Sequence, residues 1–232
     1  MESAKYIISD LGIVCALGRD RAEVTRNLAA GEAPGMRALT GLTGGDSTVF
    51  GFIPGWGPER PAELEPDETR VGRLVDLAMA QLDLERLFAE VDPRRIGAVV
   101  GTSNSTMEEF TDNPDRINMA YPAERLRDKW GVKGPCWSVS TACSSSAKVF
   151  ASARRLLEMK VCDAVIVGGA DAYTRTVVEG FHSLEALSPT RCRPCSPNRD
   201  GINLGEGSAF FILTLSPSHP LTFPPALPRR CR

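Results

Sequence analysis

A continuous apolar run at residues 96–100, Ile-Gly-Ala-Val-Val, is the feature that most constrains how this chain can fold. The run carries no polar side chain and ends at Gly101, which is typical of a central strand buried on both faces. Such a strand needs other elements packed over each face of its sheet. Residues 96–100 therefore predict the middle of an α/β domain.

Strand and helix patterns alternate along the rest of the chain, as in an α/β fold. Apolar residues at 71, 74, 75, 78 and 82 follow helical spacing and predict one helix face packed on the core. The polar residues of that segment fall on its other faces: Arg70, Arg73, Asp76 and Gln81. Residues 34–68, rich in glycine and proline, predict a surface excursion that covers a pocket or a dimer surface. The other elements are expected as strands at 6–14, 49–53, 136–139, 163–167 and 208–215, and as helices at 21–30, 121–130 and from 147 onward.

Cys143 lies at the junction of a strand and a helix. Upstream, residues 136–139 predict a short buried strand with Trp137 in the core, and downstream helical spacing begins at Ala147. The free backbone N–H groups and the dipole of a helix N-terminus favour an anion, such as a thiolate. Cys143 is therefore a candidate nucleophile, and the alternative is a buried thiol that only packs.

The helix dipole cannot activate a thiol without help. It contributes about 0.3–1 kcal/mol at an ordinary site, which lowers a thiol pKa by less than about one unit and leaves most of an ordinary thiol protonated at neutral pH. A base or a cation is needed as well, and histidine is the usual one. The chain contains only His182 and His219.

Composition limits the classes of function. The chain has 232 residues, of which 42% are hydrophobic and 24% charged, so it can bury a core. Its net charge is −2 and its basic residues form no patch, which argues against a nucleic-acid-binding protein. No apolar window is long enough to span a membrane, and residues 1–5 lack a signal core, so a cytoplasmic protein is expected. Gly168-Gly169 is interpreted as a tight turn, because no phosphate-binding motif follows it. No cofactor is predicted.

Seven cysteines without a secretion signal favour reduced thiols over disulfides. Residues 192–195, Cys-Arg-Pro-Cys, have the spacing of half a zinc site, but such a site needs four ligands and no second pair of this kind is present. His182 and Cys231 are weak candidates for further ligands, so no metal is predicted and the segment is interpreted as a loop with two free thiols. Cys15 and Cys162 have apolar neighbours and are expected in the core.

Several segments resemble, in order, the β-ketoacyl synthases, which are condensing enzymes of fatty-acid and polyketide assembly. Residues 141–146, Thr-Ala-Cys-Ser-Ser-Ser, resemble the active-site motif of that family, with Cys143 at the position of its acyl-accepting cysteine. Residues 163–171 are similar to the strand and glycine turn that follow the nucleophile helix. The segments at 11–18, 186–189, 198–201 and 205–207 match the opening strand, a later loop and the start of the strand after it. The resemblance covers about residues 5 to 215.

The resemblance implies a thiolase-like fold, which consists of two similar halves, each a five-stranded mixed sheet with helices. It implies that this chain forms one such half, an N-terminal domain over residues 1–215. The implied activity is transfer of an acyl group from acyl carrier protein to Cys143, followed by decarboxylative condensation with a malonyl group on the same kind of carrier. The implied partners are acyl carrier protein with acyl and malonyl thioesters, and a homodimer mate or a partner synthase subunit.

The catalytic histidines, the lysine and the phenylalanine–glycine loop of the family's second half have no match here. His182 lies in a segment that matches the first half, and His219 lies in residues 216–232, a proline- and arginine-rich tail expected to be disordered. The chain is therefore expected to be a truncated or frame-shifted synthase. Without a covering half, apolar surface is expected on the nucleophile helix, at Ala147, Val149, Phe150, Ala151, Ala153, Leu156, Leu157 and Met159.

Two alternatives remain open at this point. One is a non-catalytic half-protein that binds a synthase partner or carrier protein, and the other is a thiolase-like enzyme that uses coenzyme A thioesters. Asp200 and Glu206 are expected to order the loop before the last strand rather than to act as bases, and Lys148 is expected to be solvated.

Overall fold

The computed structural model describes residues 5–107 and 117–216. Its main sheet has five strands in the order β1 (Lys5–Val14), β7 (Gly207–Ser216), β6 (Ala164–Asp171), β4 (Ile96–Gly101) and β5 (Cys136–Val139). β4 runs parallel to β5 and β6, whereas β7 runs antiparallel to β6 and β1. The expected five-stranded mixed sheet is therefore confirmed. A separate hairpin pairs β2 (Met36–Leu39) with β3 (Thr48–Gly51).

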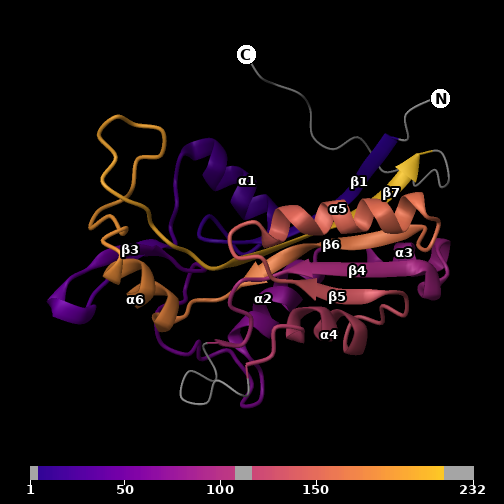
Figure 1. Ribbon diagram of the computed structural model, residues 1–232, viewed down its shortest axis with the longest axis horizontal. Coiled ribbons are helices and arrows are strands. Elements are labelled where there is room, and N and C mark those ends of the chain that lie inside the picture. Colours follow the sequence, from indigo (N-terminus) through magenta and orange to yellow (C-terminus); the bar gives the residue numbers. More distant parts are fainter. Residues whose placement is uncertain (1–4, 108–116, 217–232) are drawn as a thin grey trace.

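Helices cover both faces of the main sheet (Figure 1). They are α1 (Arg21–Ala30), α2 (Arg70–Met79), α3 (Leu84–Glu90), α4 (Tyr121–Asp128), α5 (Ser145–Glu158) and α6 (Arg175–Ser183), with short 3₁₀ turns at Thr43–Gly45 and Pro93–Arg95. α5 lies on one face, and α2 and α4 lie on the other (Figure 1). No helix in the described ranges is long and apolar enough to cross a membrane.

The apolar run at 96–100 forms β4, and every residue of that strand is buried. Ile96, Ala98 and Val100 belong to the core on the α2 side, whereas Val99 belongs to the cluster on the α5 side. Side chains of successive strand residues point to opposite faces, so a strand packed on both sides has to be apolar throughout. This arrangement explains why the run has no polar position.

The segment at 34–68 is only partly a surface excursion. Six of its apolar residues are at most 3% exposed and belong to the larger core: Leu39, Leu42, Phe50, Phe52, Ile53 and Trp56. The expectation from glycine and proline content was wrong here, because those residues shape turns between anchoring side chains. The hairpin is thereby fixed to the body of the domain.

Two polar side chains of α2, those of Arg70 and Asp76, are buried. Arg70 is 2% exposed and forms a bidentate ion pair with Glu206, with Nε–Oε2 and Nη2–Oε1 distances of 2.6 and 2.8 Å. Asp76, which is 5% exposed, accepts hydrogen bonds from Arg125, Lys129 and Trp130 of α4 and the turn after it. Burial alone would raise the pKa of Asp76, but these donors hold it below its usual value.

α5 approaches the sheet closely where glycines replace larger residues. A Cβ atom at Gly101 would lie 2.7 Å from the backbone nitrogen of Ser146, and one at Gly169 would meet the Ser146 hydroxyl. Gly168 and Gly169 lie inside β6, so their interpretation as a tight turn was wrong. Their missing side chains make room for the first turn of α5 and for β7.

Two differences concern single elements. Trp137 is 37% exposed on the edge strand β5 and is not a core residue, because β5 has a neighbour on one side only within the described part of the chain. α6 was not predicted, since its sequence lacks a long apolar repeat and only Val178 is buried.

Breaking the Arg70–Glu206 pair on one side should be strongly destabilising. Arg70→Met leaves the Glu206 carboxylate buried without its cation, which costs about 3–5 kcal/mol of unfolding free energy. Denaturant unfolding monitored by circular dichroism measures this loss. The double variant Arg70→Met/Glu206→Leu should recover much of it, and Arg86→Met at the exposed Arg86–Glu90 pair should cost less than about 1 kcal/mol. Equal losses at the two pairs would contradict a dominant role for the buried one.

Gly101→Ala should displace the first turn of α5. The added methyl group meets helix backbone, which cannot rotate away, so we expect a loss of about 1–3 kcal/mol in thermal unfolding. Gly180→Ala in α6 is the matched control, because its Cβ would meet nothing within 4 Å and its φ is not positive. That control should be neutral or stabilising by up to about 1 kcal/mol. Similar losses in both variants would argue against close packing at Gly101.

Candidate active site

Cys143 lies in the connection between β5 and α5, just before the helix begins at Ser145. It is exposed, which excludes the alternative of a buried packing thiol. The preceding residue, Ala142, has a φ of 52°, in the left-handed region that residues other than glycine rarely adopt. The chain therefore turns sharply at Ala142 and presents Cys143 at the amino end of α5.

The serines after Cys143 hold this turn together. The Ser145 hydroxyl accepts a hydrogen bond from the Thr141 backbone nitrogen at 2.9 Å and donates one to the Ala142 carbonyl at 2.6 Å. The Ser144 hydroxyl donates to the Thr141 carbonyl at 2.9 Å. Two hydroxyl groups thus bond across the strained residue, so the position of the thiol is fixed by its neighbours.

A cavity of about 330 Å³ opens beside Cys143. α6 contributes Val177, Val178 and Phe181 to its wall, and the hairpin contributes Phe50. α6 is tied to the segment before β3, because His182 Nε2 lies 3.0 Å from an Asp46 carboxylate oxygen and Glu179 accepts from the Thr43 nitrogen. The thiol therefore faces a largely apolar cavity, and polar contacts hold α6, which forms part of the cavity wall, to the segment before β3.

Asp171 organises the polar part of the same cavity. Its carboxylate accepts hydrogen bonds from the Thr102 hydroxyl (2.8 Å), the Ser103 nitrogen (2.7 Å), the Ser103 hydroxyl (2.9 Å) and the Asn104 nitrogen (3.1 Å). β4 and β6 end side by side, so this carboxylate joins the ends of two adjacent strands. The sequence analysis did not single out Asp171, and its place at the end of a buried strand was the available signal.

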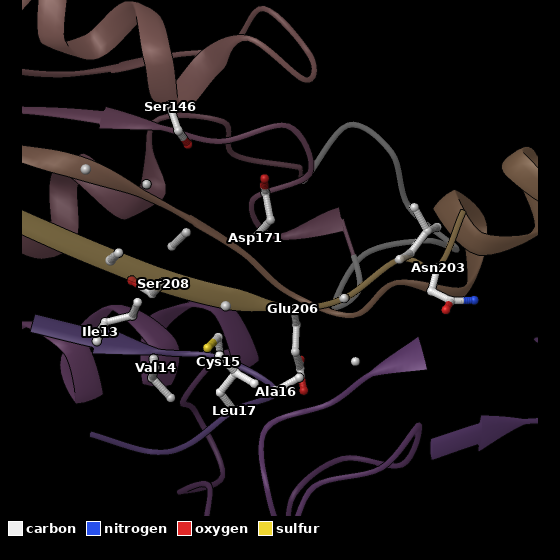
Figure 2. Close-up of a pocket in the computed structure, with 18 of the residues that line it drawn as sticks. Ile13, Val14, Cys15, Ala16, Leu17, Ser146, Asp171, Asn203, Glu206 and Ser208 are labelled. Carbon is white, nitrogen blue, oxygen red and sulfur yellow. The ribbon is translucent and has the colours of Figure 1, made fainter. Parts of the chain in front are cut away.

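A second, larger cavity of about 560 Å³ forms a groove along β1, β6 and β7 beside α5. Figure 2 shows Ser146 and Asp171 on one side of the β7 ribbon and Ile13, Cys15 and Leu17 on the other. This groove also includes the phenyl rings of Phe150 and Phe211, whose centroids lie 5.7 Å apart. Its lining is mostly apolar, and Cys15 lies along it, only partly buried, rather than deep in the core.

The apolar surface expected on α5 is arranged differently from the prediction. Val149, Ala153 and Leu157 are at most 2% exposed and pack on the sheet. The outward face of the helix carries mainly charged residues with two alanines: Ala147, Lys148, Ala151, Arg154, Arg155 and Glu158. The expectation is met at Met159, directly after the helix, which is 73% exposed. Further open apolar surface lies in the groove beside the helix. The prediction overlooked that the sheet itself buries one face of α5.

The other candidate residues lie away from the thiol or have structural partners. Glu206 is buried in the pair with Arg70, and Asp200 accepts a hydrogen bond from the Ser188 hydroxyl at 2.8 Å. Lys148 is exposed. His219 and Cys231 lie outside the described residues, and within the described ranges no histidine or lysine lines the Cys143 cavity. No group of three or more potential metal ligands occurs in residues 5–107 and 117–216.

Comparisons with known proteins agree with this architecture. The family profile for "Beta-ketoacyl synthase, N-terminal domain" matches residues 76–218. Nodulation protein E of Rhizobium sp. (strain N33) is 25% identical over 90% of this chain and 57% of its own length. 3-Oxoacyl-[acyl-carrier-protein] synthase 2 of Staphylococcus aureus is 29% identical over 58% of this chain and 38% of its own length. The chain thus spans little more than half the length of the first of these relatives.

Among solved structures, the ketosynthase ApeO of Xenorhabdus doucetiae, in complex with its chain length factor ApeC, is similar with a TM-score of 0.81 and 34% identity. That alignment covers 91% of this chain and 58% of the ketosynthase. A β-ketoacyl synthase of Burkholderia phymatum shares the fold, with a TM-score of 0.68 at 24% identity. From the family match, the sheet order and the strand-to-helix turn together, we conclude that this chain belongs to the β-ketoacyl synthase family and corresponds to its N-terminal half.

Proposed function

We propose that this protein acts in acyl transfer of the condensing type, with Cys143 as the residue that accepts the acyl group. The observation that carries the proposal is an exposed thiol at the amino end of α5, held by a strained turn and facing an apolar cavity of about 330 Å³. Residues 1–215 would form the domain that supplies this site. Family membership supports a substrate from fatty-acid or polyketide synthesis.

The proposed step begins with attack of the Cys143 thiolate on the carbonyl carbon of an acyl thioester. A bond forms between the cysteine sulfur and the acyl carbon, the carrier thiolate leaves, and it takes up a proton. Thioester exchange suits cysteine because sulfur is both a strong nucleophile and a good leaving group. The positive end of the α5 dipole lies next to the reacting atoms and favours the negative charge that develops there. Apolar side chains of α6 would then hold the acyl chain.

Condensation with a malonyl thioester requires a further group that stabilises the carbanion and moves protons. Within residues 5–107 and 117–216, no histidine or lysine lines the Cys143 cavity. The resemblance places such groups in the second half of the family, so full turnover is proposed only for a protein that also contains them. Acyl transfer onto Cys143 is the part of the cycle that the described residues support.

Partners follow from the same reasoning. The similar ketosynthase ApeO is in complex with its chain length factor, and we propose that this protein associates with a synthase subunit or a second copy of itself.

The proposed acyl donor is acyl carrier protein. The proposed compartment is the cytoplasm, which the free cysteines of the described residues favour. Because no histidine or lysine lines the described cavity, a second candidate function is binding of a synthase partner without turnover.

The other cysteines offer an internal comparison. Cys136 is partly buried, its sulfur lies 3.1 Å from the Ala123 carbonyl oxygen, and burial raises the pKa of its thiol to about 11. Burial also raises the pKa of Cys162. Thiolate chemistry is therefore disfavoured at these two positions, whereas Cys143 is open to reagents.

Alkylation should follow this difference. At about pH 8, iodoacetamide should modify Cys143 at least about tenfold faster than Cys136 and Cys162, because a protonated and buried thiol reacts slowly. Peptide mapping by mass spectrometry at several times measures the rates. In denaturant the difference should disappear. Fast modification of Cys136 in the folded protein would contradict the placement of that side chain.

Acylation tests the proposed function. Incubation with acyl carrier protein that bears a radiolabelled acyl thioester should yield a stoichiometric acyl adduct on Cys143, and Cys143→Ser should abolish that thioester adduct. Cys195→Ser is the matched control and should keep it, because Cys195 is also exposed but does not line the cavity. An adduct that persists in Cys143→Ala would overturn the nucleophile assignment. Faster transfer from coenzyme A than from carrier protein would favour the thiolase-like alternative.

A further inference from the structure

The loop between α6 and β7 carries a pair of cysteines that the proposed function does not use. Cys192 is half-buried and Cys195 is exposed, and both are free thiols. Figure 1 shows this loop, in orange, extending away from the sheet near α6 and β3. Only two residues separate the pair in the sequence, so both thiols belong to one short segment outside both apolar clusters of the domain.

Cys195 occupies an unusual position in a turn. The Ser196 nitrogen donates a hydrogen bond to the Arg193 carbonyl at 3.1 Å, Pro194 is the second residue of this turn, and Cys195 is the third, with a φ of 63°. Proline followed by a residue of positive φ is the pattern of a type II turn, in which glycine normally takes the third place. The turn therefore presents the Cys195 side chain to solvent from a backbone conformation that would suit glycine better.

The segment that carries the pair is basic. Residues 190–199 contain Arg191, Arg193 and Arg199, all exposed, and the next residue, Asp200, accepts a hydrogen bond from the Ser188 hydroxyl. Positive charge close to a thiol attracts anionic reagents. A small disulfide that bears carboxylates is the reagent that matches this surface.

The base of the loop is firmly attached to the domain. Leu187 pairs with Ile202, and the Asn203 side chain accepts from the Cys192 nitrogen at 2.7 Å and donates to the Thr190 carbonyl at 3.0 Å. Leu204, the next residue, lines the Cys143 cavity. Cys192 is thus held where the base of the loop is fixed, whereas Cys195 lies in the turn beyond it, which can rearrange without unfolding the domain.

We propose that Cys192 and Cys195 form a redox-active pair that closes reversibly to a disulfide by exchange with small anionic disulfides. The Cys195 thiolate attacks one sulfur of the small disulfide, a mixed disulfide forms, and one small thiolate leaves. The Cys192 thiolate then attacks the Cys195 sulfur and releases the second small thiolate. The protein loses two hydrogen atoms and the small disulfide is reduced to two thiols.

Glutathione disulfide is the probe, and cystamine, a cationic disulfide, is its matched control. Trypsin cleaves after Arg191 and Arg199 but not between Arg193 and Pro194, so both cysteines fall in one peptide, 192–199. After reaction of the folded protein and blocking of free thiols, this peptide should be lighter by two hydrogen atoms than the reduced form. Dithiothreitol should reverse the change.

Charge and sequence variants complete the test. Glutathione disulfide should react several-fold faster than cystamine at low salt, and the difference should shrink at about 1 M salt, where the Debye length falls to about 3 Å. Cys192→Ser should trap a glutathione adduct on Cys195. Two outcomes would overturn the proposal that Cys192 and Cys195 form a redox-active pair. One is persistent mixed disulfides on both cysteines of the unaltered chain, and the other is no reaction at a glutathione disulfide concentration that modifies Cys143. A faster reaction with cystamine would overturn the preference for anions.

Discussion

The buried ion pair between Arg70 and Glu206 is the interaction on which the rest of the structure depends. Besides the pair itself, the Glu206 carboxylate accepts hydrogen bonds from the backbone nitrogens of Ile53 and Tyr173, and Arg70 donates to the Gly57 and Glu59 carbonyls. The guanidinium carbon also lies 5.1 Å from the Trp56 ring centroid. Burying two charges is costly, and here hydrogen bonds to both charged groups offset most of that cost. Four chain segments meet at the pair: residues 53–59, Arg70, Tyr173 and Glu206.

Those segments are the ones that build the candidate site. Tyr173 leads into α6, which walls the Cys143 cavity, and Glu206 follows Leu204 and Gly205, which line it. The side chain of Ile53 secures the hairpin that contributes Phe50. The thiol is therefore positioned by local hydrogen bonds, whereas the cavity in front of it is positioned by an ion pair that lies against Tyr173, whose ring in turn contacts Phe50.

Much of the fold could be predicted from the sequence, because its elements have strong local signals. The uninterrupted apolar run of β4, the helical repeat of α2 and the Gly31 end of α1 are such signals, and the family motif identified Cys143 as the candidate thiol. The misses concern tertiary partners. Nothing local shows that Arg70 and Asp76 find buried partners far along the chain, that Gly168 lies within a strand, or that β5 leaves Trp137 at an edge. The role of Asp171 likewise depends on the meeting of two strand ends.

β4 contributes to two apolar clusters of very different size. The cluster on the α2 side includes residues from the hairpin, α2, α3 and α4, whereas the one on the α5 side includes mainly Val149, Ala153 and Leu157 with their sheet partners. Local opening requires less free energy where fewer apolar side chains become hydrated. We therefore expect the amide hydrogens of α5, the helix that follows the thiol, to exchange with solvent at a lower opening free energy than those of α2.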